Sequence, residues 1–73
     1  MATPPAHERI LAWRRWLGYS QERLGNLIGC TQGAVGLIER DERGVGRKLA
    51  NRIAARMAES GYGDVILPTD WDD

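Results

Sequence analysis

The polar and basic side chains of residues 31–43 offer the clearest chemistry in this chain of 73 residues. Thr31 and Gln32 stand where a short helix is expected to begin, and a glutamine amide can form two hydrogen bonds with the edge of an adenine. Arg40 and Arg43 follow that helix, and guanidinium groups bind phosphates through two parallel hydrogen bonds. This combination predicts contact with the bases and phosphates of double-stranded DNA.

The same chain offers little for catalysis or for metal binding. It has one histidine, His7, and one cysteine, Cys30, so a zinc site of the usual Cys/His kind cannot be assembled. It shows no Ser/His/Asp set and no glycine loop that would cradle a phosphate. Glu39 is the one tempting carboxylate, and its place at a helix end beside Arg40 indicates a structural ion pair. We therefore expect no enzymatic activity, no cofactor and no metal.

Two short helices joined by a tight turn are predicted to position the polar side chains. Ser20 can cap the first, over residues 21–28, because its hydroxyl can accept a hydrogen bond from a free backbone N–H. Gly29 can end it, since the residue after a helix often adopts the left-handed conformation. Thr31 can cap the second helix, which extends to about Glu39. Two helices this close must cross steeply, in the helix-turn-helix geometry, and the beginning of the second then projects from the domain.

Residues 20–40 resemble the helix-turn-helix of the Cro and phage-repressor family (the XRE family). The matching positions are Ser20, Gln21, Glu22, Leu24, Gly25, Gly29, Thr31, Val35, Ile38 and Glu39. With its flanking helices, the resemblance covers roughly residues 7–58. It implies an all-α, compact lambda-repressor-like DNA-binding domain of four to five helices. It also implies that Gln21 touches the DNA backbone and can brace the second helix, the recognition helix.

The recognition helix has an unusually small number of polar side chains for this family. Gly33 and Gly36 stand where relatives usually have polar residues, and Leu37 stands where they often have a polar reader of bases. The glycines are either tolerated surface variation or a means of letting the helix lie deep in the major groove. An exposed Leu37 could contact a thymine methyl group. Recognition is therefore expected to use Gln32, Leu37, nearby arginines and DNA shape.

A first helix is predicted from Pro5 or Ala6 to Leu17, because proline suits the first helical position. Its buried residues are expected three and four positions apart, at Ile10, Trp13 and Leu17. Trp16 lies off this stripe, and we expect it in the core or at its edge, with a partner interface as the alternative. The basic residues of this helix are expected to face solvent or phosphate: Arg9, Arg14 and Arg15.

A further helix is predicted over residues 47–60, after a polar loop. Its apolar face consists of Leu49, Ile53 and Met57, together with three alanines. Another face carries a line of basic residues, namely Lys48, Arg52 and Arg56. This line is either a solvated surface or a set of phosphate contacts. Arg47 and Lys48 are the better candidates for phosphate because they lie near the loop.

The C-terminal residues differ from the rest in charge. Residues 1–58 hold ten basic and five acidic side chains, whereas residues 59–73 hold five acidic and no basic ones. This asymmetry indicates a nucleic-acid-binding body with an acidic tail. We divide the chain into a helix-turn-helix domain over residues 1–63 and an acidic tail or dimerisation arm over residues 64–73. Because Pro68 argues against much helix, the tail is expected to form an edge strand or an extended arm. Its candidate dimerisation residues are Val65, Ile66, Leu67 and Trp71.

These features together predict a sequence-specific transcriptional regulator, a homodimeric repressor of a bacterial or phage operon that includes its own gene. Such a dimer would bind an inverted-repeat operator. The alternative is an antitoxin-type module, whose domain binds DNA and whose acidic tail binds a protein partner. A variant treats the tail as a DNA mimic that lowers affinity. No long apolar run and no signal-peptide pattern occurs, so we expect no membrane association and a cytoplasmic location, with which a single unpaired cysteine agrees.

Overall fold

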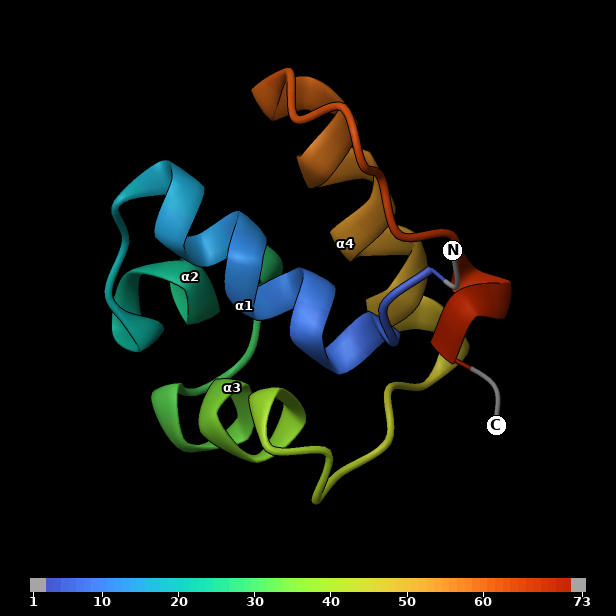
Figure 1. Ribbon diagram of the computed structural model, residues 1–73. Coiled ribbons are helices and arrows are strands. Elements are labelled where there is room, and N and C mark those ends of the chain that lie inside the picture. The colour runs from blue at the N-terminus through green and yellow to red at the C-terminus, as the bar shows by residue number, and fades with distance from the viewer. Residues whose placement is uncertain (1–2, 72–73) are drawn as a thin grey trace.

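Four α-helices and one short 3-10 helix form the computed structural model, which describes residues 3–71 (Figure 1). The elements are α1 (Ala6–Leu17), α2 (Gln21–Ile28), α3 (Gln32–Glu39), α4 (Arg47–Ser60) and the 3-10 helix η1 (Pro68–Trp71). No strand occurs within these residues, and the predicted all-α class is confirmed. Residues 1 and 2 of the predicted domain, and Asp72 and Asp73 of the predicted acidic tail, lie outside the described residues. None of the helices in this range is both long and apolar enough to cross a membrane.

The helices begin and end where local capping signals predicted. Ser20 Oγ accepts a hydrogen bond from the backbone N–H of Arg23, and Thr31 Oγ1 accepts one from that of Ala34, each at 3.1 Å. Gly29 follows α2 with a φ of 81°, in the left-handed region that glycine adopts without strain. The predicted bounds of all four α-helices are confirmed to within about a residue.

The core lies where the four α-helices meet. In Figure 1, α1 crosses the middle of the molecule, with α3 below it and α4 to its right. Each α-helix, and the C-terminal segment, contributes fully buried side chains: Ile10, Trp13, Leu24, Ile28, Val35, Ile38, Ile53, Met57 and Ile66. Leu17 and Leu49, which were also expected on buried faces, are partly buried and pack against this cluster.

Residues 64–71, which we call the strap, fold back onto their own chain. In Figure 1 the strap runs beside α4 and brings η1 close to the beginning of α1. Its anchor is Ile66, which is fully buried and whose backbone N–H donates to Met57 Sδ at 3.5 Å. Of the two forms predicted for this segment, the edge strand is not formed within residues 3–71. The extended arm is present, but it lies on its own body and ends in the single turn of η1.

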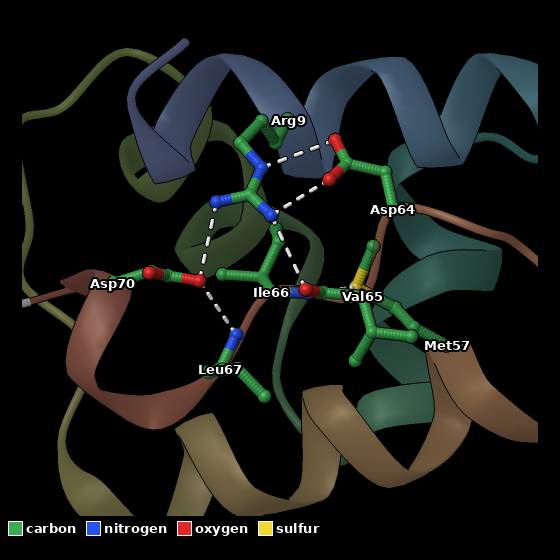
Figure 2. A network of polar contacts seen from close by, with 7 residues as sticks. All are labelled: Arg9, Met57, Asp64, Val65, Ile66, Leu67 and Asp70. Atoms are coloured by element: carbon green, nitrogen blue, oxygen red, sulfur yellow. Dashed lines mark hydrogen bonds and ion pairs between the residues drawn. The ribbon is translucent and has the colours of Figure 1, made fainter. Parts of the chain in front are cut away.

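The guanidinium group of Arg9 in α1 holds the strap in place (Figure 2). Arg9 Nε and Nη2 donate to the two carboxylate oxygens of Asp64 at 3.1 and 2.8 Å, and Nη1 donates to Asp70 at 3.2 Å. Nη2 also donates to the carbonyl oxygen of Val65 at 3.2 Å. The expectation that Arg9 faces solvent or phosphate is wrong, because the strap covers it and leaves it 7% exposed. The hydrogen bond and charge of Asp64, with a smaller effect of Asp70, raise the pKa of Arg9 against the effect of burial.

Two other residues of α1 also differ from expectation. Arg14 does not face solvent or phosphate, because it binds Glu39 of α3. Trp16 lies outside the core with 56% of its surface exposed, since α1 turns Ile10 and Trp13 inward. The Trp16 ring contacts that of Tyr62, with 5.1 Å between the ring centroids. This contact joins the end of α1 to the segment after α4.

Candidate nucleic-acid interface

Two glycines allow the turn between α2 and α3 to be tight. A Cβ atom on Gly25 would collide with the backbone oxygen of Cys30, and one on Gly29 would collide with the Arg52 guanidinium. The backbone N–H of Cys30 donates to the Gly25 carbonyl at 2.9 Å across this turn. This close approach fixes where α3 begins relative to α2. The first residues of α3 are therefore held at a defined position on the surface of the domain.

Side chains from α1, α2 and α3 meet at Glu39 and fix the orientation of α3. Glu39 is 9% exposed, and its carboxylate accepts hydrogen bonds from Arg14 Nε at 2.6 Å and Arg14 Nη2 at 3.2 Å. It also accepts one from Gln21 Nε2 at 3.0 Å. The structural ion pair predicted for Glu39 is thus formed, but with Arg14 instead of Arg40. We call these three residues the brace, and the bracing contact expected of Gln21 is present in it.

The beginning of α3 is open to solvent. Thr31, Gln32 and Gly33 are exposed, and a Cβ on Gly33 would meet nothing within 4 Å. Thr31 Oγ1 already accepts the Ala34 N–H, so its hydroxyl hydrogen is left for donation. The Gln32 amide forms no hydrogen bond within the described part of the chain. This end of the helix therefore presents one amide and one hydroxyl to a ligand.

Gly36 and Leu37 are less accessible than expected. Gly36 is buried, because a Cβ there would lie 3.5 Å from the Gln21 amide and 3.3 Å from Arg40 Nη1. The missing side chain at Gly36 therefore makes room for these two residues, and the expectation of an exposed position is wrong. Leu37 is half-buried, so only part of its side chain can reach a ligand. Of Gly33 and Gly36, only Gly33 leaves open space into which DNA could approach the helix closely.

The two arginines after α3 differ in whether a carboxylate of the chain already pairs with them. Arg40 Nε donates to Glu42 at 2.5 Å in an exposed pair, which offsets part of its charge. Arg43 is exposed and forms no ion pair within residues 3–71. Burial raises the pKa of the Cys30 thiol, and the positive charges of Arg43 and Arg52 act against that rise. Arg43 therefore lies close enough to the α2–α3 turn for its charge to be felt there.

The basic residues of α4 fall into two groups. Arg47 and Lys48 are exposed, with no ion pair among the described residues, and Arg47 lines a pocket with Asn51 and residues 68–69 of the strap. Arg52 and Arg56 instead donate to the last carbonyl oxygens of α2, those of Ile28 and Leu27, at 3.2 and 3.3 Å. These two arginines cap the C-terminal end of α2, a role that neither interpretation of the basic line included.

The predicted dimerisation residues do not form one exposed surface. Ile66 is fully buried, and Val65 and Trp71 are partly buried and pack against the core, whereas Leu67 is 55% exposed. The strap carboxylates Asp64 and Asp70 are bound to Arg9, as Figure 2 shows. Within the described strap, Leu67 is thus the apolar side chain most accessible to a partner.

Sequence reasoning missed the roles of Arg9 and Arg14. A signal for the brace existed, because Glu39 lies four residues after Val35 and so on the buried side of α3, where a carboxylate needs a cation from another element. Arg9 lies three and four residues from the buried Ala6 and Trp13, which places it beside the buried stripe. Its partners are 55 and 61 positions away, and no local pattern points to them.

Within residues 3–71, no three His, Cys, Asp or Glu side chains lie close enough together to hold a metal ion. In comparisons with known proteins, the chain matches no protein-family model, no curated protein and no solved structure.

Proposed function

We propose that the chain is a sequence-specific DNA-binding regulator with a lambda-repressor-like helix-turn-helix, which acts as a homodimeric repressor of a bacterial or phage operon that includes its own gene. The observation that carries the proposal is the pairing of an exposed beginning of α3 with a part-buried brace at the C-terminal end of the same helix. The brace of Arg14, Gln21 and Glu39 holds α3 rigidly, while Gln32 stays free to bind. A rigid helix end with unpaired polar groups suits the major groove. A regulator of this kind acts in the cytoplasm.

Phosphate contacts would set the register of the protein on DNA. Arg43 and Lys48 are exposed and free of ion pairs among the described residues, and Arg43 is near the α2–α3 turn. Gln21 lies at the first position of α2, where free backbone N–H groups favour a phosphate, and beside it Arg40 extends over Gly36. Arg47 lies beside the strap, so we give it a lesser part in phosphate binding.

Base contacts would come from a short stretch of α3. Gln32 is the main candidate because its amide can pair with adenine, and Thr31 can donate its hydroxyl hydrogen. The exposed part of Leu37 can touch a thymine methyl group. Since few side chains read bases directly, DNA shape should contribute to recognition.

The structure gives the acidic tail a different use from the one in the antitoxin-type alternative. Asp64 and Asp70 are counterions of Arg9, and Ile66 is in the core. A tail occupied in this way is a poor candidate for a free partner-binding segment or for a mimic of DNA. These contacts favour the regulator.

The test is binding to the DNA directly upstream of the gene, where an inverted repeat is expected. Gln32→Ala should weaken binding to that DNA by ~1–3 kcal/mol and relax specificity, whereas Arg43→Ala should lower the salt dependence by about one phosphate contact per protomer. Asn51→Ala, which removes an exposed amide from α4, is the matched control for Gln32. Unchanged affinity and unchanged salt dependence in both variants would rule out the proposed interface.

A further inference from the structure

One side of α1 is left uncovered by the rest of the described chain. Glu8, Ala12, Arg15 and Trp16 are all exposed, and their spacing places them on the same side of the helix. Glu8 and Arg15 form no ion pair within residues 3–71, in contrast to Arg9 and Arg14 on the same helix. We call the surface of these four exposed residues the α1 face.

Trp16 gives the α1 face an apolar anchor. It is one of two large hydrophobic side chains that the described chain exposes, the other being Leu67. The Tyr62 ring contacts that of Trp16 at an interplanar angle of 57° and so supports it from one side. Tryptophan is enriched among the residues that dominate binding energy in protein interfaces. A side chain that is already oriented loses little further entropy when a partner covers it.

The charges of the α1 face are complementary to those of a second copy of the same face. If two α1 helices pack antiparallel about a two-fold axis at Ala12, the rise of ~1.5 Å per residue puts Glu8 about 6 Å to one side of the axis. Arg15 and Trp16 of the other copy lie at about 4.5 and 6 Å on that same side. Each Glu8 therefore meets an Arg15, and the two-fold axis makes both pairs form together. The small side chain of Ala12 at the axis lets the helices approach closely.

We propose that the α1 face binds the α1 face of a second copy of this chain, with the two helices antiparallel. The homodimer itself comes from the proposed function, on which this inference rests. The inference adds which surface of the chain forms the dimer interface. Arg14, which binds α3 through Glu39, is about 200° around the helix from Ala12. Docking on the α1 face thus leaves α3 and Gln32 uncovered.

The test measures the oligomeric state of the full chain without DNA, by sedimentation equilibrium over a wide range of concentrations. Trp16→Ala and Ala12→Arg should each weaken dimerisation about tenfold or more, since they remove the anchor or obstruct the axis. Glu8→Arg and Arg15→Glu should each weaken it about tenfold, because like charges then face each other twice. The double variant Glu8→Arg/Arg15→Glu should restore the dissociation constant to within about threefold, as a charge exchange preserves complementarity. Leu67→Ala is the control and should change nothing.

The outcomes separate this inference from the proposed function. The α1 interface is overturned if the wild-type chain stays monomeric at every concentration. It is also overturned if Leu67→Ala breaks the dimer while Trp16→Ala and the charge variants leave it intact. Since all the substituted residues are exposed, urea midpoints measured on the same variants show whether each one is folded. A monomer that binds the upstream DNA through Gln32 overturns the interface and the homodimeric state, and leaves the proposed DNA binding in place. A dimer of the expected charge dependence that shows no affinity for that DNA supports the interface and overturns only the regulator.

Discussion

At the scale of single residues, two arginines of α1 have their charges satisfied by carboxylates from distant parts of the chain. Arg9 is held by Asp64 and Asp70, and Arg14 by Glu39. Removing an ion from water costs several kcal/mol, so a buried guanidinium is stable only with such partners. These arginines are therefore part of the framework and do not belong to a nucleic-acid surface.

Replacing Arg9 shows how much the strap depends on it. Arg9→Met keeps much of the length of the side chain but removes its charge and every hydrogen bond to the strap. Because Asp64 and Asp70 are partly exposed, water can solvate them afterwards, and we expect a loss of about 2 kcal/mol rather than the ~3–5 kcal/mol of a fully buried pair. Urea denaturation followed by circular dichroism measures this. Lys48→Met in α4, at an exposed position without an ion pair among the described residues, should stay within about 0.5 kcal/mol. Equal midpoints for the two variants would contradict the assigned role of Arg9.

Cys30 should be a slow nucleophile at neutral pH. Burial raises the pKa of its thiol, and Arg43 and Arg52 oppose that rise only in part. The thiolate is the reactive form, so alkylation by iodoacetamide should be slower in the native chain than in the unfolded one and should increase as the pH rises past the ordinary range of a thiol. Because the folded chain favours the neutral thiol, this raised pKa contributes to the free energy of unfolding at low and neutral pH. The contribution is lost as the pH rises through the range in which an unfolded thiol ionises and on to the raised pKa of Cys30. Arg43→Ala should slow the native reaction further. A native rate equal to the unfolded one would show that the thiol is not shielded.

At the scale of elements, the sequence predicted the helices well because their ends depend on neighbouring residues. Ser20, Thr31 and Gly29 each act on a backbone group within a few positions. The path of the strap could not be predicted in this way. Ile66 is buried against helices that come much earlier in the chain, so a short apolar run before Pro68 could equally have been a free arm. The brace could be predicted in part. The position of Glu39 on the buried side of α3 indicates that it needs a cation, but no nearby residue pattern identifies Arg14 as that cation.

Two glycines of the α2–α3 segment, Gly25 and Gly33, should respond oppositely to alanine. Gly25→Ala improves helix propensity, but its methyl group would collide with the Cys30 backbone oxygen, which cannot rotate away as a side chain does. We expect a net loss of about 1–3 kcal/mol, as for other overpacked sites. Gly33→Ala points into open space and should gain up to about 1 kcal/mol. Thermal unfolding of both variants measures the difference. A stabilised Gly25→Ala variant would mean that the α2–α3 turn is looser than the contact implies.

At the scale of the whole molecule, several acidic residues of the C-terminal part form ion pairs with basic residues of the body, which reduces the charge asymmetry seen in the sequence. The strap carboxylates neutralise Arg9, and Glu59 pairs with Arg56 near the end of α4. A count of charges could not show this, because the pairing depends on how the tail folds. The cations left without an ion pair within residues 3–71 include Arg43 and Lys48, which are among the proposed phosphate contacts. The net charge of zero therefore does not argue against DNA binding.

The exposed pair of Arg40 and Glu42 lies directly after α3, and Glu42 should limit DNA affinity. The two side chains are 59% and 55% exposed, so their mutual attraction is weak and Arg40 can be released at little cost. Glu42→Gln removes a negative charge facing the phosphates and frees Arg40 to bind one. Under the proposed function, affinity for the upstream DNA should rise, and the plot of log K against log salt should steepen by about 0.9 per protomer. Glu59→Gln is the matched control, since it frees an arginine that also caps α2. If Glu42→Gln weakened binding or left the slope unchanged, Arg40 would not face a phosphate, and the DNA surface would have to lie nearer Arg43 and Lys48 than to the end of α3.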